Sequence, residues 1–340
     1  MSAPRTAVQE FRRALLDWYR AVRRPLPWRE TRDPYRVWLS EIMLQQTRVA
    51  AALPYYQRFL ERFPTVEALA AAPEEKLLKA WEGLGYYTRA RNMQKAAKKI
   101  VAAGAFPNTY EGIWDLPGIG AYTAAAIASV VFGLRHAVLD GNVMRVVSRL
   151  TNDAGDIRNL ATRARLQSEA DALLNPQEPA DHNQAMMELG ATLCLPKSPQ
   201  CLLCPVSAHC RAFQEGTQNE LPIKSRPREK VVRERVLYLV RRNGSVLLWQ
   251  RPQSERLMPG FWELPEAEHL PSAKPVGKPL AEFKHTITHH EFRFQVRAAK
   301  AGGRKHGCEW IAWSKIESLP LSTIARKALR HCVPKLAAKA

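Results

Sequence analysis

The chain has 340 residues, 46% of them hydrophobic, and its 51 Lys and Arg exceed its 32 Asp and Glu to give a formal net charge of +19. This length favours two domains over one, and the charge fits a nucleic-acid partner as well as it fits a protein with an ordinary basic surface. The chain has no run of about 18 apolar residues, so we expect no membrane span. The N-terminal stretch has no signal-peptide pattern, so we expect neither secretion nor structural disulfides.

The sequence pattern changes once along the chain. Residues 1–213 predict successive helices, because alanine-rich periodic segments alternate with Pro and Gly stops. Residues 214–230 are polar and basic and predict a linker. In residues 231–340, two apolar runs around Asn243-Gly244 predict a hairpin, alternating runs predict further strands, and a helix closes the chain. We therefore predict a multidomain protein with an all-α domain followed by an α+β domain.

The first candidate carboxylate is Glu41. Asp33-Pro34 is a good helix start, with Asp as the cap and Pro in the first turn, which places Glu41 in the middle of this helix. Its neighbours on the same face include Trp38 and Leu44, three residues away on either side. A carboxyl group in such apolar surroundings has a raised pKa and can act as a general acid; the alternative is a surface glutamate at the edge of the apolar stripe.

Residues 116–133, LPGIGAYTAAAIASVVFG, place Gly118 and Gly120 directly before a strongly helical run. The glycines permit a tight turn and a close approach of phosphate to backbone N–H groups at the start of the helix. An ordinary turn is the alternative. The second candidate carboxylate follows in HAVLDGNVMRV, where Asp140 precedes a new helix and is either a helix N-cap or a functional acid.

Four of the six cysteines lie in residues 194–210 with the spacing C-x6-C-x2-C-x5-C. Zinc sites usually combine two C-x2-C pairs, and only the middle pair has that spacing. The longer gaps suit a loop around a group bulkier than one ion, which favours a [4Fe–4S] cluster over zinc and over four buried thiols. The four candidate ligands are Cys194, Cys201, Cys204 and Cys210.

The cysteine spacing, the hairpin LPGIGAYTA and the aspartate in VLDGNVMRV resemble the endonuclease III superfamily of DNA glycosylases. Longer stretches, among them LPWR at 26–29, LSEIMLQQTRV at 39–49, WEGLGYYTRARN at 81–92 and HNQAMMELGATLC at 182–194, resemble its MutY-type adenine DNA glycosylases. This resemblance implies a helix–hairpin–helix domain that binds the DNA backbone at Gly118 and Gly120 and carries a [4Fe–4S] cluster.

The same resemblance implies the chemistry. Glu41 would protonate the adenine, and Asp140, positioned by Asn142, would stabilise the sugar cation, as paired carboxylates do in other glycoside hydrolases. Attack by water would then leave an abasic site. Endonuclease III has a Schiff-base lysine where this chain has Tyr122. A phenol cannot form that adduct, so Tyr122 implies a monofunctional glycosylase without strong lyase activity.

Further roles are implied for residues around the flipped base. Gln45, one helical turn beyond Glu41, and Tyr86 would enter the duplex while the adenine leaves the stack. Trp28 and Tyr86 could equally be core aromatic residues. The residues that would line the adenine pocket are Arg24, Leu26, Trp28 and Gln184.

In the C-terminal part, LLWQRPQSERLMPGFWELPEAE resembles the Nudix-like domain with which MutY-type enzymes recognise 8-oxoguanine. The family usually has Phe-Ser-His in the recognition loop, and this chain has Ile287, Thr288 and His289, so Thr288 and His289 are the implied contacts. The alternative is an ordinary strand with surface histidines. No acidic helix follows Glu263, so we do not expect pyrophosphate hydrolysis.

We therefore expect an adenine glycosylase of base excision repair. Its partners would be double-stranded DNA with adenine opposite 8-oxoguanine or guanine, and other repair proteins. We expect a monomer without membrane association, in the bacterial cytoplasm at the nucleoid, or in the nucleus if eukaryotic. The alternatives are an endonuclease III-like glycosylase-lyase for oxidised pyrimidines, disfavoured by Tyr122, a non-catalytic DNA-binding iron–sulfur sensor, disfavoured by the Glu41–Asp140 pair, and a Nudix hydrolase.

Overall fold

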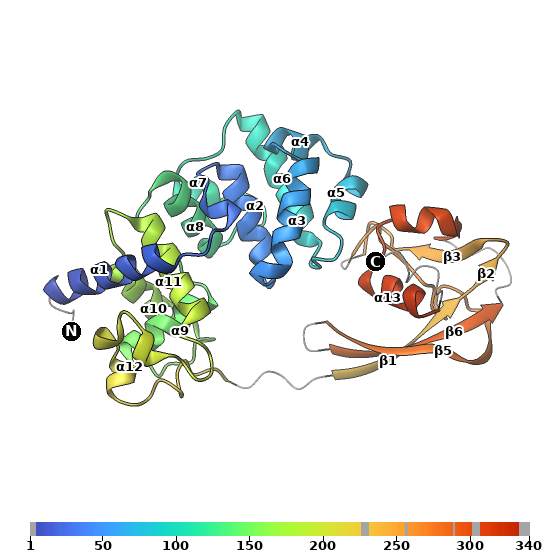
Figure 1. The fold of residues 1–340 in the computed structure, drawn as a ribbon. Coiled ribbons are helices and arrows are strands. Elements are labelled where there is room, and N and C mark those ends of the chain that lie inside the picture. Colours follow the sequence, from blue (N-terminus) through green and yellow to red (C-terminus); the bar gives the residue numbers. More distant parts are fainter. Residues whose placement is uncertain (1–4, 226–230, 256–257, 288–289, 301–306, 333–340) are drawn as a thin grey trace. The chain divides into compact units, whose positions relative to one another are not determined.

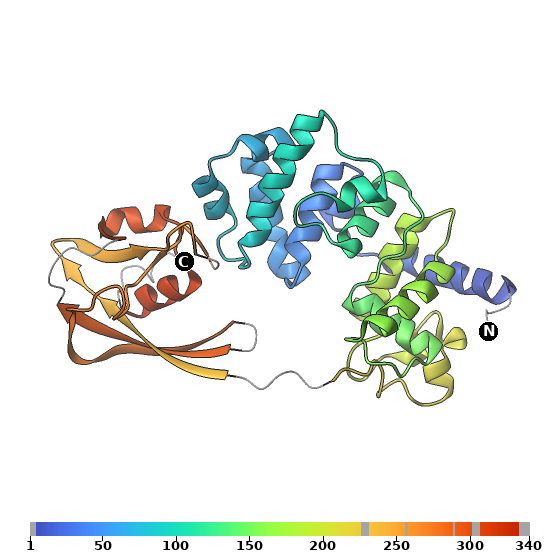
Figure 2. The same cartoon turned by 180° about the vertical axis from the view of Figure 1, so that it is seen from behind.

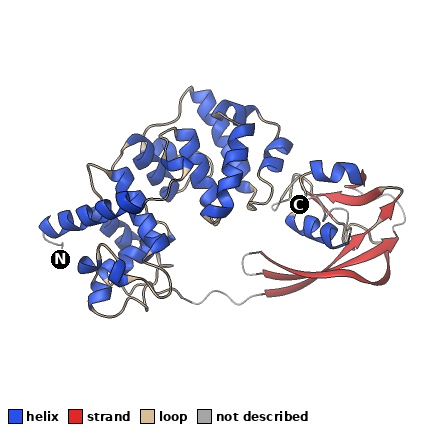
Figure 3. Cartoon of the chain, in the orientation of Figure 1, coloured by secondary structure: helices blue, strands red, loops and turns tan. Residues whose placement is uncertain are grey.

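The computed structural model of the chain describes residues 5–225, 231–255, 258–287, 290–300 and 307–332 (Figure 1). It divides into two compact units, one made of Met1–Ala70 and Asn92–Arg226, the other of Ala71–Arg91 and Pro227–Ala340. The described elements before residue 226 are all helical, and all described strands lie after residue 230, followed by one 3-10 helix and one α-helix (Figure 3). No described helix is both long and apolar enough to span a membrane.

The described elements before residue 226 are helices (Figures 1 and 2), and those within residues 71–91 group with the second unit. In chain order the helical elements are α1 (Arg5–Val22), η1 (Pro27–Arg29), α2 (Pro34–Leu44), α3 (Val49–Arg62), α4 (Val66–Ala71), α5 (Glu74–Ala80), α6 (Thr88–Ala103), α7 (Tyr110–Trp114), α8 (Ala121–Phe132), α9 (Gly141–Thr151), α10 (Leu160–Leu173), α11 (Pro179–Thr192), η2 (Cys201–Leu203), η3 (Ser207–His209) and α12 (Arg211–Gln214).

The core of the first unit follows from helical spacing. In α1, Phe11, Leu15 and Tyr19 recur every four residues and all three are buried. Helix α8 is buried from Thr123 to Val130, and its alanines allow close packing against α2, α7 and α11. This central position places Tyr122, in the first turn of α8, next to residues from other helices.

The part of the chain that packs on the helices of the first unit extends past residue 213, where the sequence predicts the start of a linker. Leu221 is buried, its carbonyl accepts a hydrogen bond of 3.0 Å from Arg149 Nε, and the Ile223 carbonyl accepts one of 3.0 Å from the Ile157 amide. The segment 217–223 is therefore fixed to the helices. The predicted domain boundaries otherwise remain predictions, and residues 71–91, predicted to lie in the helical domain, group with the second unit.

The second unit contains two sheets. One has the order β1-β6-β5, with β1 parallel and β5 antiparallel to β6, and in the other β3 pairs with β2, β4 and β7, antiparallel to each. Its elements after residue 230 are β1 (Val231–Leu239), β2 (Arg241–Arg242), β3 (Ser245–Gln250), β4 (Trp262–Glu263), β5 (Lys274–Ile287), β6 (His290–Lys300), β7 (Cys308–Ala312), η4 (Trp313–Ser318) and α13 (Thr323–Cys332).

The predicted turn, strands and closing helix of this unit are confirmed, but the hairpin is shorter than predicted, because most of its first apolar run belongs to β1, which pairs with β6 and not with β3. Asn243 and Gly244 have φ of 43° and 72°, the left-handed values that a two-residue hairpin turn requires, and they join β2 to β3. Helix α13 follows the last strand, as predicted. Residues 264–273 form turns without a helix, which agrees with the missing acidic helix. The predicted order, helices first and an α+β part second, is confirmed.

Candidate active site

Glu41 is buried in the middle of α2. The helix begins as predicted, since Asp33 is its N-cap and accepts a hydrogen bond of 3.0 Å from the Arg36 amide. Glu41 is 5% exposed, and its Oε2 accepts a hydrogen bond of 2.8 Å from the Tyr122 hydroxyl. Burial raises the pKa of Glu41 to about 7, assisted by the negative charge of Asp140 and opposed by the Tyr122 hydrogen bond. Glu41 can therefore carry a proton near neutral pH.

Tyr122 connects three elements. Its hydroxyl donates to Glu41 on α2 and lies 3.3 Å from the Met187 sulfur on α11. Burial raises the pKa of Tyr122 well above its usual value, as do the charges of Glu41 and Asp140. The phenol therefore keeps its proton and acts as a hydrogen-bond donor at ordinary pH.

Asp140 is the N-cap of α9, and its charge raises the pKa of both Glu41 and Tyr122. Its Oδ1 accepts from the amides of Asn142 (2.9 Å) and Val143 (2.7 Å), and its Oδ2 accepts from Asn142 Nδ2 (3.1 Å). Burial raises the pKa of Asp140, although these donors oppose the shift. Arg145 donates to Asn142 Oδ1 at 2.9 Å, which turns the amide NH₂ group of Asn142 toward Asp140. The two alternatives for Asp140, cap and functional acid, are therefore compatible.

The two hairpin glycines, Gly118 and Gly120, differ in backbone conformation and in the space around them. Gly118 has a φ of +80°, and a Cβ atom there would lie 2.6 Å from the Asn92 Cβ. Gly120 is the N-cap of α8, with extended backbone and no atom within 4 Å of the space a Cβ would fill. No side chain caps α8, so the N–H groups of its first turn are available to an anion.

The predicted pocket residues lie on two segments, residues 24–28 and helix α11, and charged side chains link these segments. Leu26 and Trp28 are buried, and the Trp28 ring packs edge-on against Tyr56 with centroids 5.2 Å apart. Arg24 donates to both oxygens of Glu188, at 2.6 and 2.8 Å.

Arg29 links the same two segments, because it donates to Glu188 Oε2 at 2.7 Å and to Gln184 Oε1 at 3.1 Å. Sequence inspection missed Arg29, Glu188 and Met187. The four-residue spacing of Gln184 and Glu188, which places them on one face of α11, was the available signal.

The two predicted wedge residues lie at chain reversals. Helix α2 ends at Leu44, so Gln45 is its C-cap rather than part of its last turn, and Gln45 Nε2 donates to Thr123 Oγ1 at 3.3 Å. Tyr86 has a φ of +48° and is 53% exposed, with the Arg89 guanidinium 5.5 Å from its ring centroid. The exposure of Tyr86 disagrees with the alternative of a core aromatic, whereas the burial of Trp28 leaves both of its alternatives open.

The four clustered cysteines are half-buried free thiols, three of which pack against the core of the first unit. No group of three or more His, Cys, Asp or Glu among the described residues is arranged to hold a metal ion. The thiols are nevertheless close enough to influence one another. Burial, together with the charges of Cys194, Cys210 and Cys201, raises the pKa of Cys204 to about 12.

Two arginines of α9 hold the cysteine loop. Arg149 Nη1 lies 3.2 Å from the Cys194 sulfur and 2.7 Å from the Leu195 carbonyl, and Arg145 Nε donates to the Cys194 carbonyl at 2.7 Å. Four thiols from one short loop, with a guanidinium against one sulfur, are a donor set that fits an anionic thiolate-bound cluster.

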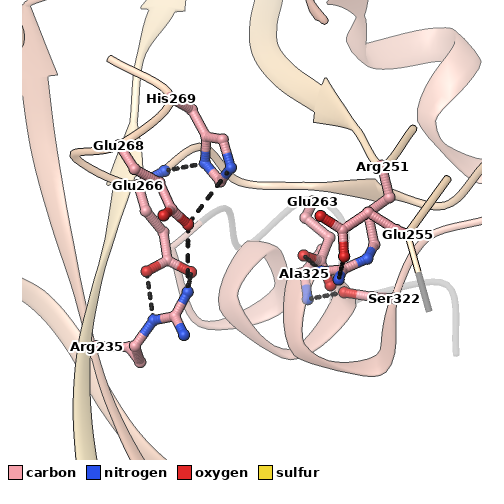
Figure 4. Close-up of polar contacts among 9 residues, drawn as sticks. All are labelled: Arg235, Arg251, Glu255, Glu263, Glu266, Glu268, His269, Ser322 and Ala325. Atoms are coloured by element: carbon pink, nitrogen blue, oxygen red, sulfur yellow. Dashed lines mark hydrogen bonds and ion pairs between the residues drawn. The ribbon is translucent and has the colours of Figure 1, made fainter. Parts of the chain in front are cut away.

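A cavity of about 810 Å³ lies in the second unit, and Tyr86, His285 and Thr286 contribute to its wall. Its apolar lining includes Leu237, Trp249, Leu264, Phe292, Phe294 and Ile324. The lining also includes two groups of charged residues, whose polar contacts Figure 4 shows. In one, Arg235 donates to both oxygens of Glu266 at 2.5 and 2.7 Å, and His269 accepts the Glu266 N–H at 3.0 Å.

In the other, Arg251 donates to Glu263 at 2.9 Å and to Glu255 at 3.1 Å. Each arginine is therefore neutralised by carboxylates within the cavity wall. The predicted contacts Thr288 and His289 lie outside the described residues. The last residue described before that gap is Ile287 at the end of β5, and His285 and Thr286 precede it.

Comparisons with known proteins agree with this architecture. Residues 39–171 match the model of the HhH-GPD superfamily of base excision DNA repair proteins, and residues 235–331 match that of the NUDIX domain. The chain is 34% identical to an adenine DNA glycosylase of Rattus norvegicus over 95% of this chain and 78% of that protein. It is 33% identical to one of Homo sapiens, over 95% and 74%, and 35% identical to one of Buchnera aphidicola subsp. Baizongia pistaciae, over 74% and 71%.

Two solved structures resemble the helical part. A thermostable thymine-DNA glycosylase is 29% identical with a TM-score of 0.57, covering 62% of this chain and 98% of its own. An endonuclease III trapped in a covalent intermediate with DNA is 23% identical with a TM-score of 0.53, covering 63% and 99%. The second likeness concerns the fold alone.

Proposed function

The chain belongs to the family of adenine DNA glycosylases, so it is a DNA N-glycosylase of base excision repair, and we propose that the adenine it removes lies opposite 8-oxoguanine or guanine. The protein would act as a monomer where the DNA is, in the bacterial cytoplasm or the eukaryotic nucleus, together with other repair proteins.

The observation that carries the mechanism is the buried Glu41 carboxyl with its hydrogen bond from Tyr122. Adenine leaves poorly as an anion, so the bond between its N9 and the sugar C1′ breaks readily only when the base is protonated. Glu41, protonated near neutral pH, would donate that proton, and neutral adenine would leave. Tyr122 keeps its own proton, supports the carboxylate that remains, and offers no amine for a Schiff base.

Asp140 would stabilise the positive charge that develops on the sugar as the base departs, by its own charge or by a covalent bond to C1′. Its three hydrogen-bond donors support this role, because they hold the carboxylate in one orientation. Water would then add to C1′ and give up a proton, leaving an abasic site.

Recognition of the opposite base is the part of the proposal that concerns the second unit. What supports it is that Tyr86, the implied wedge, lines the same cavity as His285 and Thr286. These two residues lie two and three positions before Thr288 in the chain, and the family resemblance assigns contact with 8-oxoguanine to Thr288 and His289. The aromatic lining of the cavity is suited to a planar base.

A [4Fe–4S] cluster is the cofactor we propose, held by Cys194, Cys201, Cys204 and Cys210. The cluster would order the loop that bears these cysteines, and no catalytic step is assigned to it. Elemental analysis of the purified protein tests this. We expect about four iron and four acid-labile sulfide per chain, and a Cys204→Ser variant should lose both; one zinc without iron would contradict the proposal.

The function is tested with excess protein and duplexes that carry one adenine opposite 8-oxoguanine, one adenine opposite guanine, or one thymine glycol. We expect strand cleavage at adenine only after hot alkali, which reveals an abasic site, and no cleavage at thymine glycol. Cleavage at thymine glycol without alkali would indicate a lyase instead. Tight duplex binding without cleavage of any substrate would indicate a non-catalytic DNA-binding protein.

A further inference from the structure

Glu188 is a buried carboxylate between the two segments that would form the base pocket. Its side chain is 1% exposed, and it receives hydrogen bonds from two guanidinium groups, of Arg24 and Arg29. Arg29 is also almost buried, with 8% of its side chain exposed. A buried charge costs free energy unless it is paired and hydrogen-bonded. The pairing of one carboxylate with two guanidinium groups is thus a fixed feature of this region.

The charge balance agrees with a permanently ionised Glu188. Burial alone would raise the pKa of Glu188, but the hydrogen bonds from Arg24 and Arg29 outweigh it and lower the pKa below its usual value. Arg29 additionally donates to the Arg24 carbonyl at 3.3 Å and lies 5.7 Å from the Tyr19 ring centroid. The Arg29 guanidinium is therefore held in place from several sides.

The position of Arg29 determines the orientation of the Gln184 amide. Arg29 Nε can only donate, so the atom of Gln184 that lies 3.1 Å from it must be the oxygen. The NH₂ group of Gln184 then points away from Arg29. An amide without this partner could rotate and exchange its donor and acceptor, but a fixed amide presents one pattern only.

We propose that Glu188 is a positioning residue of the base pocket, which holds Arg29 and thereby fixes the donor and acceptor of Gln184 for adenine. This inference rests on the proposed function. Adenine has an amino donor at C6 and an acceptor at N1, whereas hypoxanthine has a carbonyl acceptor at C6 and an N–H donor at N1, so the two bases present opposite donor and acceptor patterns to an amide. A fixed Gln184 selects between them, and a rotating one does not.

The test compares single-turnover excision of adenine and of hypoxanthine from otherwise identical duplexes. In the Glu188→Gln variant, we expect the rate for adenine to fall roughly 5- to 100-fold, since a buried guanidinium loses its ionised partner. The preference for adenine over hypoxanthine should fall at least about fivefold. The dissociation constant for the duplex should stay within about threefold, because Glu188 is buried.

A second variant keeps the test decisive if Glu188→Gln does not fold. Arg29→Lys retains a cation for Glu188 but lacks the planar fork that reaches Gln184 at the same time. It should therefore fold and show the same loss of preference.

The matched control is Glu178→Gln, which removes a carboxylate ten residues earlier, at the N-cap of the same helix, from an exposed pair with Arg20. It should match the parent in rate and preference. If Glu188→Gln or Arg29→Lys slowed the excision of adenine and of hypoxanthine equally, so that the preference for adenine stayed unchanged, the positioning role would be overturned. Failure of the parent protein to excise adenine would instead contradict the proposed function.

Discussion

The Tyr122 hydroxyl donates a hydrogen bond of 2.8 Å to Glu41 Oε2, and this bond joins the first turn of α8 to the middle of α2. The acceptor is a carboxyl whose pKa burial has raised to about 7, and the donor is a phenol whose pKa burial has raised well above its usual value. The pair therefore combines an acid that exchanges its proton near neutral pH with a donor that does not.

Tyr122→Phe should shift the pH dependence of adenine excision. The hydrogen bond from Tyr122 lowers the Glu41 pKa, so its removal should move the midpoint of the pH–rate profile upward from about 7. The maximal rate should fall roughly 3- to 10-fold, because the carboxyl loses a partner that orients it. Single-turnover rates across this pH range measure both effects. An unchanged midpoint in Tyr122→Phe, compared with a Tyr110→Phe control on α7, would show that the bond does not tune Glu41.

Asp140→Asn and Asp140→Ala should separate capping from catalysis. Asparagine is also a good N-cap but carries no charge. Both variants should lose roughly 10³-fold or more in excision rate. Only Asp140→Ala should also unfold more easily, by about 1 kcal/mol, because α9 loses its cap. Excision assays and denaturant titrations of both proteins test this, and an Asp140→Asn protein within tenfold of the parent rate would refute the charge-based role.

Alanine in place of Gly118 should lower stability, whereas alanine in place of Gly120 should lower DNA affinity. Gly118→Ala combines a φ of +80° with a contact of 2.6 Å to Asn92, and should lower the free energy of unfolding by at least about 1–2 kcal/mol. Gly120→Ala has extended backbone and open space, so its stability should match the parent. Its new methyl group lies where a phosphate would approach, so duplex affinity should fall. Thermal unfolding and DNA titration distinguish them; equal stability of the two variants would contradict the assignment.

His182 should make the protein sensitive to acid. It is 2% exposed, and burial, together with the charge of Arg12, lowers its pKa to about 3. Below pH 6.5 the unfolded chain takes up a proton on this histidine, whereas the folded protein does not until the pH nears 3. The stability that neutral His182 contributes above pH 6.5 is therefore lost as the pH falls from 6.5 toward 3.

Between about pH 6.5 and pH 5 this costs roughly 2 kcal/mol. His182→Phe should flatten that slope, which denaturant titrations at the two pH values measure. Parallel pH slopes in the parent and the variant would show that His182 is not responsible.

Local structure was predictable where one segment carries its own signal. The Asp33-Pro34 start of α2, the Asn243-Gly244 turn and the glycines before α8 each depend on neighbours in the sequence. The Arg29–Glu188 contact joins residues 159 positions apart, and the Arg149–Cys194 contact joins residues 45 apart.

Such contacts depend on how helices pack, which periodicity within one helix does not specify. For the same reason, the parallel pairing of β1 with β6 and the grouping of residues 71–91 with the second unit were not foreseen.

The most direct test of the account is the single-turnover rate of adenine excision as a function of pH, for the parent protein and for Glu41→Gln. If protonated Glu41 is the general acid, the parent rate should decline as pH rises above about 7, approaching tenfold per pH unit. Glu41→Gln should be roughly 10²- to 10⁴-fold slower and should lack this decline. A parent rate that is constant through pH 7, or a Glu41→Gln protein as fast as the parent, would contradict the central role of Glu41.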